Sequence, residues 1–241
     1  MLRRVKAEPG VRLACQSRPF GDVSVAPLLP SNWPLAALRR REWPMPGEER
    51  FIVVMMVDMR NSTRLAETRL PFDAVFIVDR FVTAAGTAVD ASGGRVSHFL
   101  GDGLLATFGL ACGPKQACLQ ALSALGAIGR NVAALNRVLV DETGEAVRFG
   151  VGVHCGSAVV GEIGYGAMRT FTTLGDAANV AARLEGLCKE LDCEAVVSHD
   201  VWRIADLSPD ALPRHETTLR DRTASLLVHP IERVDQLASP V

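Results

Sequence analysis

The chain has 241 residues, of which 48% are hydrophobic and 22% are charged. This composition is typical of a globular protein with a well-filled core, and the length suits one large domain with an extra segment or two small domains. The formal net charge of −1 provides no general attraction to nucleic acid or to an anionic membrane, so we expect neither as a partner.

The sequence also indicates in which cellular compartment the protein is expected. No apolar run approaches the roughly 20 residues that span a bilayer, and the start of the chain lacks the apolar segment of a secretory signal. The six cysteines include no CxxC pair, so neither a disulfide framework nor a zinc ribbon is predicted. We therefore expect a cytoplasmic protein without a transmembrane segment, whose cysteines are mostly small hydrophobic residues.

Residues 1–30 differ in character from the rest of the chain. A Val-Arg-Leu-Ala-Cys-Gln run containing Cys15 precedes a short alternating stretch at residues 21–25. This segment resembles the C-terminal end of a plant-type or adrenodoxin-type [2Fe–2S] ferredoxin, in which such a cysteine is the last cluster ligand. The three upstream ligands of that family are absent. The resemblance thus implies a domain remnant without an iron–sulfur cluster, and an ordinary cysteine is the alternative.

Residues 31–48 contain two Trp-Pro steps and one Pro-Gly step. Repeated X-Pro steps break regular structure and favour extended or turn conformations. We interpret this stretch as a linker that leads into a main domain at residues 49–235.

The main domain begins with a continuously apolar run at residues 51–57, as expected for a strand covered on both faces. Polar residues replace it abruptly, and Asn61 or Ser62 can cap the helix that follows. A strand–turn–helix junction leaves backbone N–H groups that can bind an anion. The residues predicted to form this phosphate-binding turn are Met59, Arg60, Asn61, Ser62 and Thr63.

After a helical pattern at residues 72–90, two short apolar runs flank a Gly-Asp-Gly turn at residues 101–103, which predicts a β-hairpin. Asp102 lies at its tip, and Asp58 ends the earlier strand. If that strand pairs with the hairpin, the two carboxylates converge at one end of the sheet. Two carboxylates with nearby backbone oxygens suit Mg²⁺, which keeps water and substrate phosphate as further ligands. A solvated turn is the alternative for Asp102.

Six further helices and strands follow in the sequence pattern. They are a helix at 114–140, a strand at 147–155 with a hairpin opening at 156–161 and returning at 169–174, a helix at 177–191, and strands at 195–198 and 225–231. In the second helix Asn179 and Arg183 are four residues apart and share one face. An amide beside a guanidinium suits a phosphoryl group that gains charge in a transition state. A solvated helix face is the alternative.

Four motifs in order, at residues 57–63, 99–103, 151–156 and 174–185, resemble those of the class III nucleotidyl cyclase catalytic domain. The resemblance implies an α+β protein with the ferredoxin-like nucleotidyl cyclase fold, a βαββαβ core with additional C-terminal strands and helices. It also implies a head-to-tail homodimer in which each subunit contributes half of every active site.

The resemblance further implies a role for each matching residue. Asp58 and Asp102 would hold two Mg²⁺ or Mn²⁺ ions, with the backbone carbonyl of Met59 as an extra ligand. Asn179 would position the ribose, and Arg183 would stabilise charge on the α-phosphate, both from the opposite subunit. Among the C-terminal residues, Arg220 best matches the cation that grips the terminal phosphates.

The choice of purine is where the sequence departs from the family pattern. His98 stands where adenylate cyclases of this class usually carry Lys, and Thr172 stands at its partner position, as in one bacterial subclass of adenylate cyclases. The Glu/Cys pair typical of guanylate cyclases is absent. We predict an adenylate cyclase, a phosphorus–oxygen lyase that converts ATP into cyclic AMP and pyrophosphate in cyclic nucleotide signalling.

Several alternatives follow from the same residues. The nearest are a guanylate cyclase and a nucleotide-binding regulatory domain with weak turnover. A diguanylate cyclase shares the ferredoxin-like core, but its Gly-Gly-Asp/Glu-Glu-Phe motif is absent. An electron-transfer protein would need the missing upstream cysteines.

Overall fold

A computed structural model describes residues 47–144, 146–165, 168–208, 212–219 and 225–237. The ferredoxin-like segment at 1–30 with Cys15, all but the last two residues of the linker at 31–48, and Arg220 lie outside the described residues. The predictions made for them stay predictions.

Helices and strands alternate along the described chain. In order they are β1 (Glu48–Arg60), α1 (Ser62–Thr68), α2 (Pro71–Ala91), β2 (Arg95–Phe99), β3 (Gly103–Phe108), α3 (Pro114–Thr143), β4 (Arg148–Tyr165), β5 (Met168–Leu174), α4 (Asp176–Glu190), β6 (Ala195–Ser198), α5 (His199–Ile204), β7 (His215–Thr218), β8 (Ser225–Ile231) and a short 3-10 helix, η2 (Val234–Gln236). One eight-stranded sheet has the order β2-β3-β1-β4-β6-β8-β7, with β5 paired to β4. The predicted α+β fold with a βαββαβ core is confirmed.

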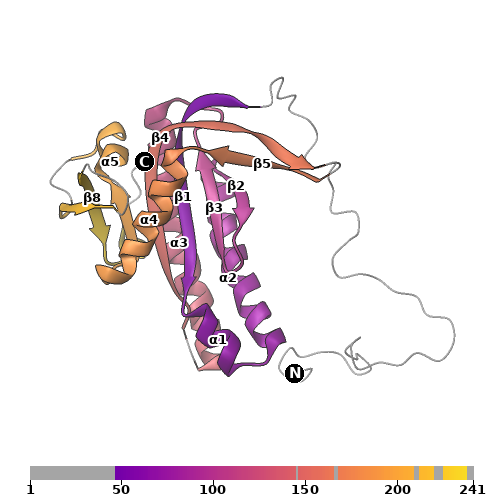
Figure 1. Ribbon diagram of the computed structural model, residues 1–241. Helices are drawn as coiled ribbons and strands as arrows, with labels where there is room; N and C mark the ends of the chain where they lie inside the picture. Colours follow the sequence, from indigo (N-terminus) through magenta and orange to yellow (C-terminus); the bar gives the residue numbers. More distant parts are fainter. Residues whose placement is uncertain (1–46, 145, 166–167, 209–211, 220–224, 238–241) are drawn as a thin grey trace. The chain divides into compact units, whose positions relative to one another are not determined.

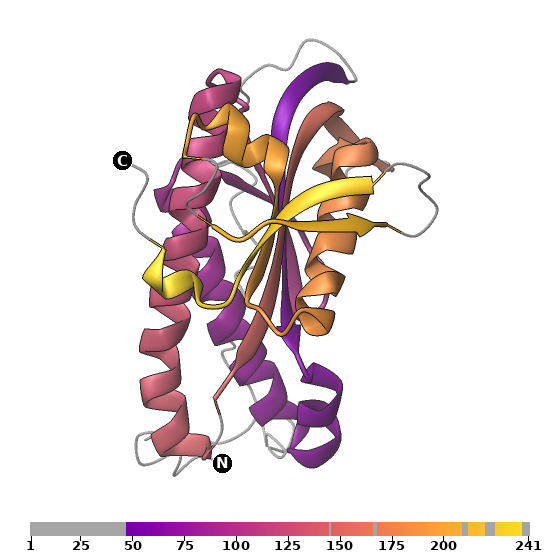
Figure 2. The same cartoon turned by 90° about the vertical axis from the view of Figure 1, so that its left-hand side faces the viewer.

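The sheet is covered on both faces, with α2 and α3 on one side and α4 on the other (Figures 1 and 2). Strand β1 divides its side chains between these two layers, because successive side chains point to opposite faces. Val53 and Val57 belong to the apolar cluster formed with α2 and α3. Ile52 and Val54 pack with the alanines of α4. Asp58 continues this second set, which places its side chain on the α4 side of the sheet.

Strand β4 differs from its prediction. It runs unbroken over 18 residues, although the glycines near its centre were interpreted as the opening of a hairpin. Gly156 pairs with Ile52 of β1, and Gly161 pairs with Thr172 of β5. Both glycines therefore lie inside backbone ladders, and the hydrogen bonds of the neighbouring strands outweigh the local tendency to turn. Strand β4 ends at Tyr165, and its residues 159–165 pair with β5.

Helix α3 carries much of the larger core. Ala121, Leu125 and Ile128 are fully buried in the cluster shared with α2 and the sheet. Among the described residues, this helix also has the length and apolarity of a membrane span, with half of the apolar window buried inside the domain. Burial against the sheet accounts for that apolar character.

The contact between α4 and β4 is unusually close. A Cβ atom added at Gly152 would lie 1.9 Å from the carbonyl oxygen of Ala181 and 2.3 Å from the backbone nitrogen of Glu185. A Cβ atom added at Gly150 would lie 2.5 Å from Oε1 of Glu185. The helix backbone therefore rests directly on the strand, and only glycine leaves room for it.

We expect Gly152→Ala to destabilise the domain by about 1–3 kcal/mol, because the added methyl group must push α4 away from β4. Gly156→Ala is the matched control on the same strand, since its Cβ atom would meet the Ala177 methyl group at an ordinary 3.7 Å. Urea unfolding of both variants measures the difference. Equal stabilities of the two variants would contradict this account of the contact.

Candidate active site

Asp58 lies at the end of β1 between two glycines. On one side it pairs with Gly103 of β3, and on the other with Gly150 of β4. A Cβ atom at Gly103 would lie 2.5 Å from both Oδ1 of Asp58 and the carbonyl oxygen of Val57. The carboxylate thus occupies space that a side chain on the neighbouring strand would fill. The pairing of the first strand with the hairpin, which the sequence analysis assumed, is present.

Asp102 is held close to this position by the turn between β2 and β3. The N–H group of Leu100 donates to the carbonyl oxygen of Gly103 at 2.9 Å, which closes the hairpin. Gly101 has a φ of +73°, in the left-handed region that favours glycine. Asp102 directly precedes Gly103, the ladder partner of Asp58. Both aspartates are partly exposed.

The two carboxylates interact electrostatically. The pKa of Asp58 is raised from 3.8 to about 6, first by burial and then by the negative charge of Asp102, while the backbone N–H of Met59 opposes the shift. Both raising effects disfavour the ionised form. A cation placed beside the pair would reverse them, so the arrangement favours binding of positive charge.

This donor set fits a hard divalent cation. Carboxylate oxygens are ligands that Mg²⁺ prefers, and the ion commonly uses one or two of them and keeps water or phosphate oxygens. In the part of the chain that the structure describes, no group of three or more His, Cys, Asp or Glu side chains could hold a metal. The two aspartates would therefore need further oxygens from the backbone, from water or from a substrate.

Glu185 is a neighbour of this site for which the sequence suggested no role. It lies on α4, half-buried over Gly150. The pKa of Glu185 is raised, first by burial and then by the charge of Asp58, with a smaller effect of Asp102, while Arg60 opposes the shift. The residue lies within one of the four motifs, but its proximity to Asp58 depends on how closely α4 approaches β4.

Asn179 and Arg183 lie on α4, as predicted. Asn179 is exposed and Arg183 is half-buried, whereas Ala177, Val180 and Ala181 bury the other side of the helix. The four-residue spacing therefore leaves the two side chains outside the face that packs on β4. Their proposed roles toward a substrate are not tested by the structure of one subunit.

The turn after β1 differs in detail from its prediction. Asn61 occupies the position before α1 with a left-handed φ of 62°, and its side chain makes no capping hydrogen bond. The helix begins instead with the N–H group of Leu65 donating to the carbonyl oxygen of Asn61 at 3.1 Å. The predicted side-chain cap by Asn61 or Ser62 is therefore wrong. Ser62 and Thr63 start the helix, and the side chain of Met59 is buried in the core.

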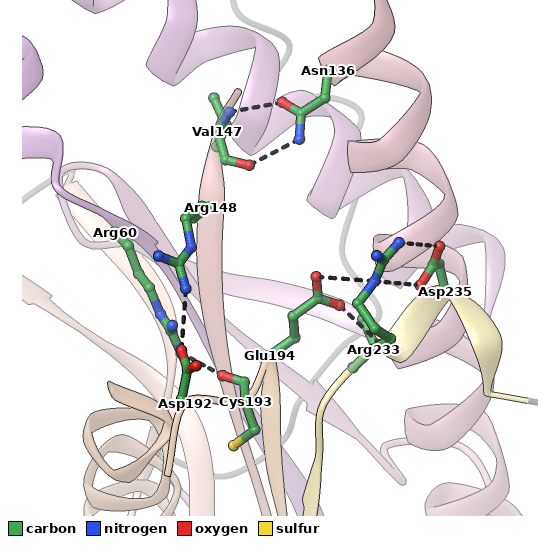
Figure 3. A network of polar contacts seen from close by, with 10 residues as sticks. Arg60, Asn136, Val147, Arg148, Asp192, Cys193, Glu194, Arg233 and Asp235 are labelled. Atoms are coloured by element: carbon green, nitrogen blue, oxygen red, sulfur yellow. Dashed lines mark hydrogen bonds and ion pairs between the residues drawn. The ribbon is translucent and has the colours of Figure 1, made fainter. Parts of the chain in front are cut away.

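Arg60 points into a network of polar contacts beside a cavity of about 700 Å³ (Figure 3). Its guanidinium donates to the carbonyl oxygen of Cys193. The other charges of the network pair with one another: Arg148 with Asp192 at 3.3 Å, Arg233 with Asp235 at 2.8 Å and Arg233 with Glu194 at 3.7 Å. Neither aspartate of the candidate site lines this cavity. The predicted contact of Arg60 with substrate stays a prediction.

His98 and Thr172 lie on different strands. His98 of β2 is partly exposed and pairs with Leu105 of β3. Thr172 of β5 is buried and pairs with Gly161 of β4. The two strands contact each other at the edge of the sheet, as Figure 1 shows.

The fold and the paired aspartates define a nucleotidyl cyclase catalytic domain, and comparisons with known proteins agree. Residues 47–224 match the adenylate and guanylate cyclase catalytic domain, and this chain belongs to that family. The crystal structure of a guanylyl cyclase has a TM-score of 0.70 at 20% identity, covering 80% of this chain and 100% of the other. The adenylyl cyclase CyaB from P. aeruginosa has a TM-score of 0.68 at 17% identity, covering 78% and 96%.

Two curated relatives are much longer than the region that they share with this chain. An adenylate cyclase of Anabaena cylindrica is 28% identical over 158 residues, which cover 64% of this chain and 30% of the relative. An uncharacterized protein of Mycobacterium tuberculosis is 34% identical over 158 residues, which cover 64% of this chain and 27% of that protein. The matched region is less than a third of each relative.

The raised pKa of Asp58 predicts a pH-dependent effect of Asp58→Asn. Because the folded-state pKa of about 6 lies above 3.8, this group's contribution to stability is complete below about pH 4 and is lost as the pH rises through about 6. In metal-free protein near pH 8, we expect the variant to be more stable than wild type by about 1 kcal/mol, a value reduced for solvent screening. The difference should vanish near pH 4.

Urea unfolding in a chelating buffer across this pH range measures the effect, with the exposed Asp79→Asn as the control. Addition of Mn²⁺ near neutral pH should stabilise wild type and not Asp58→Asn. A pH-independent difference between the two proteins would contradict the assigned cause of the shift.

Proposed function

We propose that this chain is an adenylate cyclase that converts ATP into 3′,5′-cyclic AMP and pyrophosphate at an active site shared between two copies of the domain at residues 49–235. The observation that carries the proposal is the pair Asp58 and Asp102, held together at a strand end where both neighbours of Asp58 are glycines. A half-buried carboxylate whose pKa is raised, with a second carboxylate beside it, suits a metal-bound triphosphate.

Residues of one subunit would bind the metal ions and the triphosphate. Asp58, Asp102 and the Met59 carbonyl would hold Mg²⁺ or Mn²⁺, which when bound lowers the pKa of the ribose 3′-hydroxyl and neutralises triphosphate charge. Backbone N–H groups of residues 59–63 would bind the triphosphate. These groups place the α-phosphorus where the ribose 3′-oxygen can attack it in line, and pyrophosphate leaves.

Residues of the partner subunit would complete the site. Asn179 would orient the ribose so that its 3′-oxygen faces the α-phosphorus, and Arg183 would stabilise the charge that gathers on the α-phosphate. Arg220 would bind the terminal phosphates. Asn179 is exposed and Arg183 is partly exposed. Both side chains remain outside the α4–β4 contact, which supports their proposed roles toward the substrate.

Dimer formation is supported by apolar side chains that remain exposed where β4 pairs with β5. Val159 and Ile163 of β4 and Leu174 of β5 are 43%, 51% and 52% exposed. Exposed apolar side chains gathered on neighbouring elements favour contact with another protein surface. A second copy of the domain is the occupant that the shared active site requires.

The choice of ATP rests on His98 and Thr172, which we propose to contact the purine. A neutral imidazole can donate or accept a hydrogen bond according to its tautomer, so His98 can pair with either the N1 or the exocyclic group of adenine. A relative from Anabaena cylindrica is an adenylate cyclase, whereas a similar solved structure is a guanylyl cyclase. Guanylate cyclase activity is the second candidate.

Purified protein supplied with Mn²⁺ and either ATP or GTP should form cyclic AMP with the higher kcat/KM. Asp102→Asn should lower the rate at least about 100-fold, because it removes a metal-binding charge, while Asp79→Asn should leave it unchanged. Product quantification by chromatography measures both. Cyclic GMP formed at an equal or higher kcat/KM would refute the choice of ATP, and an active Asp102→Asn would refute the site.

Mixing Asp58→Ala protein with Arg183→Ala protein should restore part of the activity that each variant lacks alone. In a mixed dimer, one of the two shared sites contains neither substitution, so about a quarter of wild-type activity is the upper expectation for random pairing. The control is a mixture of Asp58→Ala with Asp102→Ala, which leaves every mixed site damaged. Activity absent from the first mixture would contradict sharing across the dimer.

A further inference from the structure

Strands β2 and β5 bear His98 and Thr172, yet no backbone ladder joins them among the described residues: β2 pairs with β3, and β5 pairs with β4. The strands nevertheless contact each other. The direct contact between the two strands is therefore made without a shared backbone ladder, and side-chain contacts across this junction can adjust the relative position of residues on them.

A chain of three buried hydroxyl groups crosses the junction. Ser97 Oγ and Thr107 Oγ1 are 3.0 Å apart, and Thr107 Oγ1 and Thr173 Oγ1 are also 3.0 Å apart. Ser97 is 7% exposed, Thr107 0% and Thr173 5%. A hydroxyl group can donate one hydrogen bond and accept others, so Thr107 of β3 can link its two neighbours at once.

A second contact runs parallel to the hydroxyl chain. The guanidinium of Arg95 on β2 lies 4.1 Å from the centre of the Phe171 ring on β5, which is a favourable cation–π geometry. Arg95 and Ser97 are two apart on β2, as are Phe171 and Thr173 on β5. Alternate residues of one strand share a face, so these faces of β2 and β5 meet through paired contacts.

An irregularity in the backbone of β2 links the position of Ser97 to the direction of the His98 side chain. The register of β2 on β3 shifts between Val96 and His98, so Ser97 is the extra residue of a bulge. A bulge changes the direction in which the following side chain points. The hydrogen bond between Ser97 and Thr107 holds this bulge, and His98 follows it directly.

We propose that the Ser97–Thr107–Thr173 hydroxyl chain positions His98 relative to Thr172 and thereby sets the preference of the site for one purine. This inference rests on the proposed function, in which His98 and Thr172 contact the base. Thr107 is a positioning residue: it acts through its two neighbours and lies between the strands that carry the purine contacts.

Thr107→Val tests the proposal, because valine keeps the shape of threonine but removes the hydroxyl group that links both strands. We expect the ratio of kcat/KM for the preferred purine nucleotide to that for the other to fall about tenfold, since small misplacements of contacting groups are costly. The change should reside mainly in KM. Thr107→Ser, which keeps the hydroxyl group, should stay close to the wild-type ratio.

Two further variants complete the comparison. Ser97→Ala removes the hydroxyl group at the β2 end of the hydroxyl chain and should lower the kcat/KM ratio as well. If Thr107→Val does not fold, this variant is the test of the proposal. Thr217→Val, on β7 at the opposite edge of the sheet, is the matched control and should leave the ratio unchanged. An unchanged ratio in folded Thr107→Val, or in Ser97→Ala when Thr107→Val does not fold, would overturn the proposal.

Binding of non-cyclisable nucleotides separates this proposal from the proposed function. Dissociation constants for 3′-deoxy-ATP and 3′-deoxy-GTP, measured by calorimetry with Mn²⁺, report purine preference without turnover. If wild type forms no cyclic nucleotide, the proposed activity fails, but a roughly tenfold fall in the binding preference of Thr107→Val would still support the positioning role. An unchanged binding preference in folded Thr107→Val would overturn it.

Discussion

The direct contact of helix α4 with strand β4 places the side chains of α4 beside the end of β1, where Asp58 lies. Gly152 leaves room for the helix backbone, and Gly150 leaves room for Glu185. Because Gly150 is also the ladder partner of Asp58, the same approach brings α4 over the end of β1. A larger residue at Gly152 would push the helix away from the strand, and one at Gly150 would displace the Glu185 carboxylate, so the geometry of the site depends on the absence of two side chains.

The carboxylates themselves are electrostatically unfavourable in this arrangement. Burial and the charge of Asp102 raise the pKa of Asp58, and Glu185 adds a third acidic group nearby. A protein rarely gathers like charges at a partly buried strand end unless a ligand of opposite charge compensates them. This departure from ordinary packing preferences supports the metal-binding role that we propose for Asp58 and Asp102. The charges of Arg233 and Asp235, in contrast, pair with each other within the chain.

Membership of the family and the choice of purine depend on different parts of the structure. The family is carried by motifs on β1, the β2–β3 turn and α4, which are joined by backbone ladders and a close helix contact. The purine contacts that we propose come from β2 and β5, which share no backbone ladder with each other among the described residues. Changes in side chains at this contact can therefore alter the proposed purine preference without disturbing the backbone ladders of the fold.

The sequence by itself determined the elements whose signal is local. The apolar run at residues 51–57, the Gly-Asp-Gly turn and the helical spacing of Asn179 and Arg183 were sufficient to predict their strand, hairpin and helix. Residues distant in the chain decided the rest. Strand β4 continues through Gly156 because β1 supplies its hydrogen bonds. Glu185 reaches Asp58 only because α4 rests on glycines. Ser97 and Thr173 meet through Thr107 because the sheet brings three strands together, and no periodicity along the sequence contains that information.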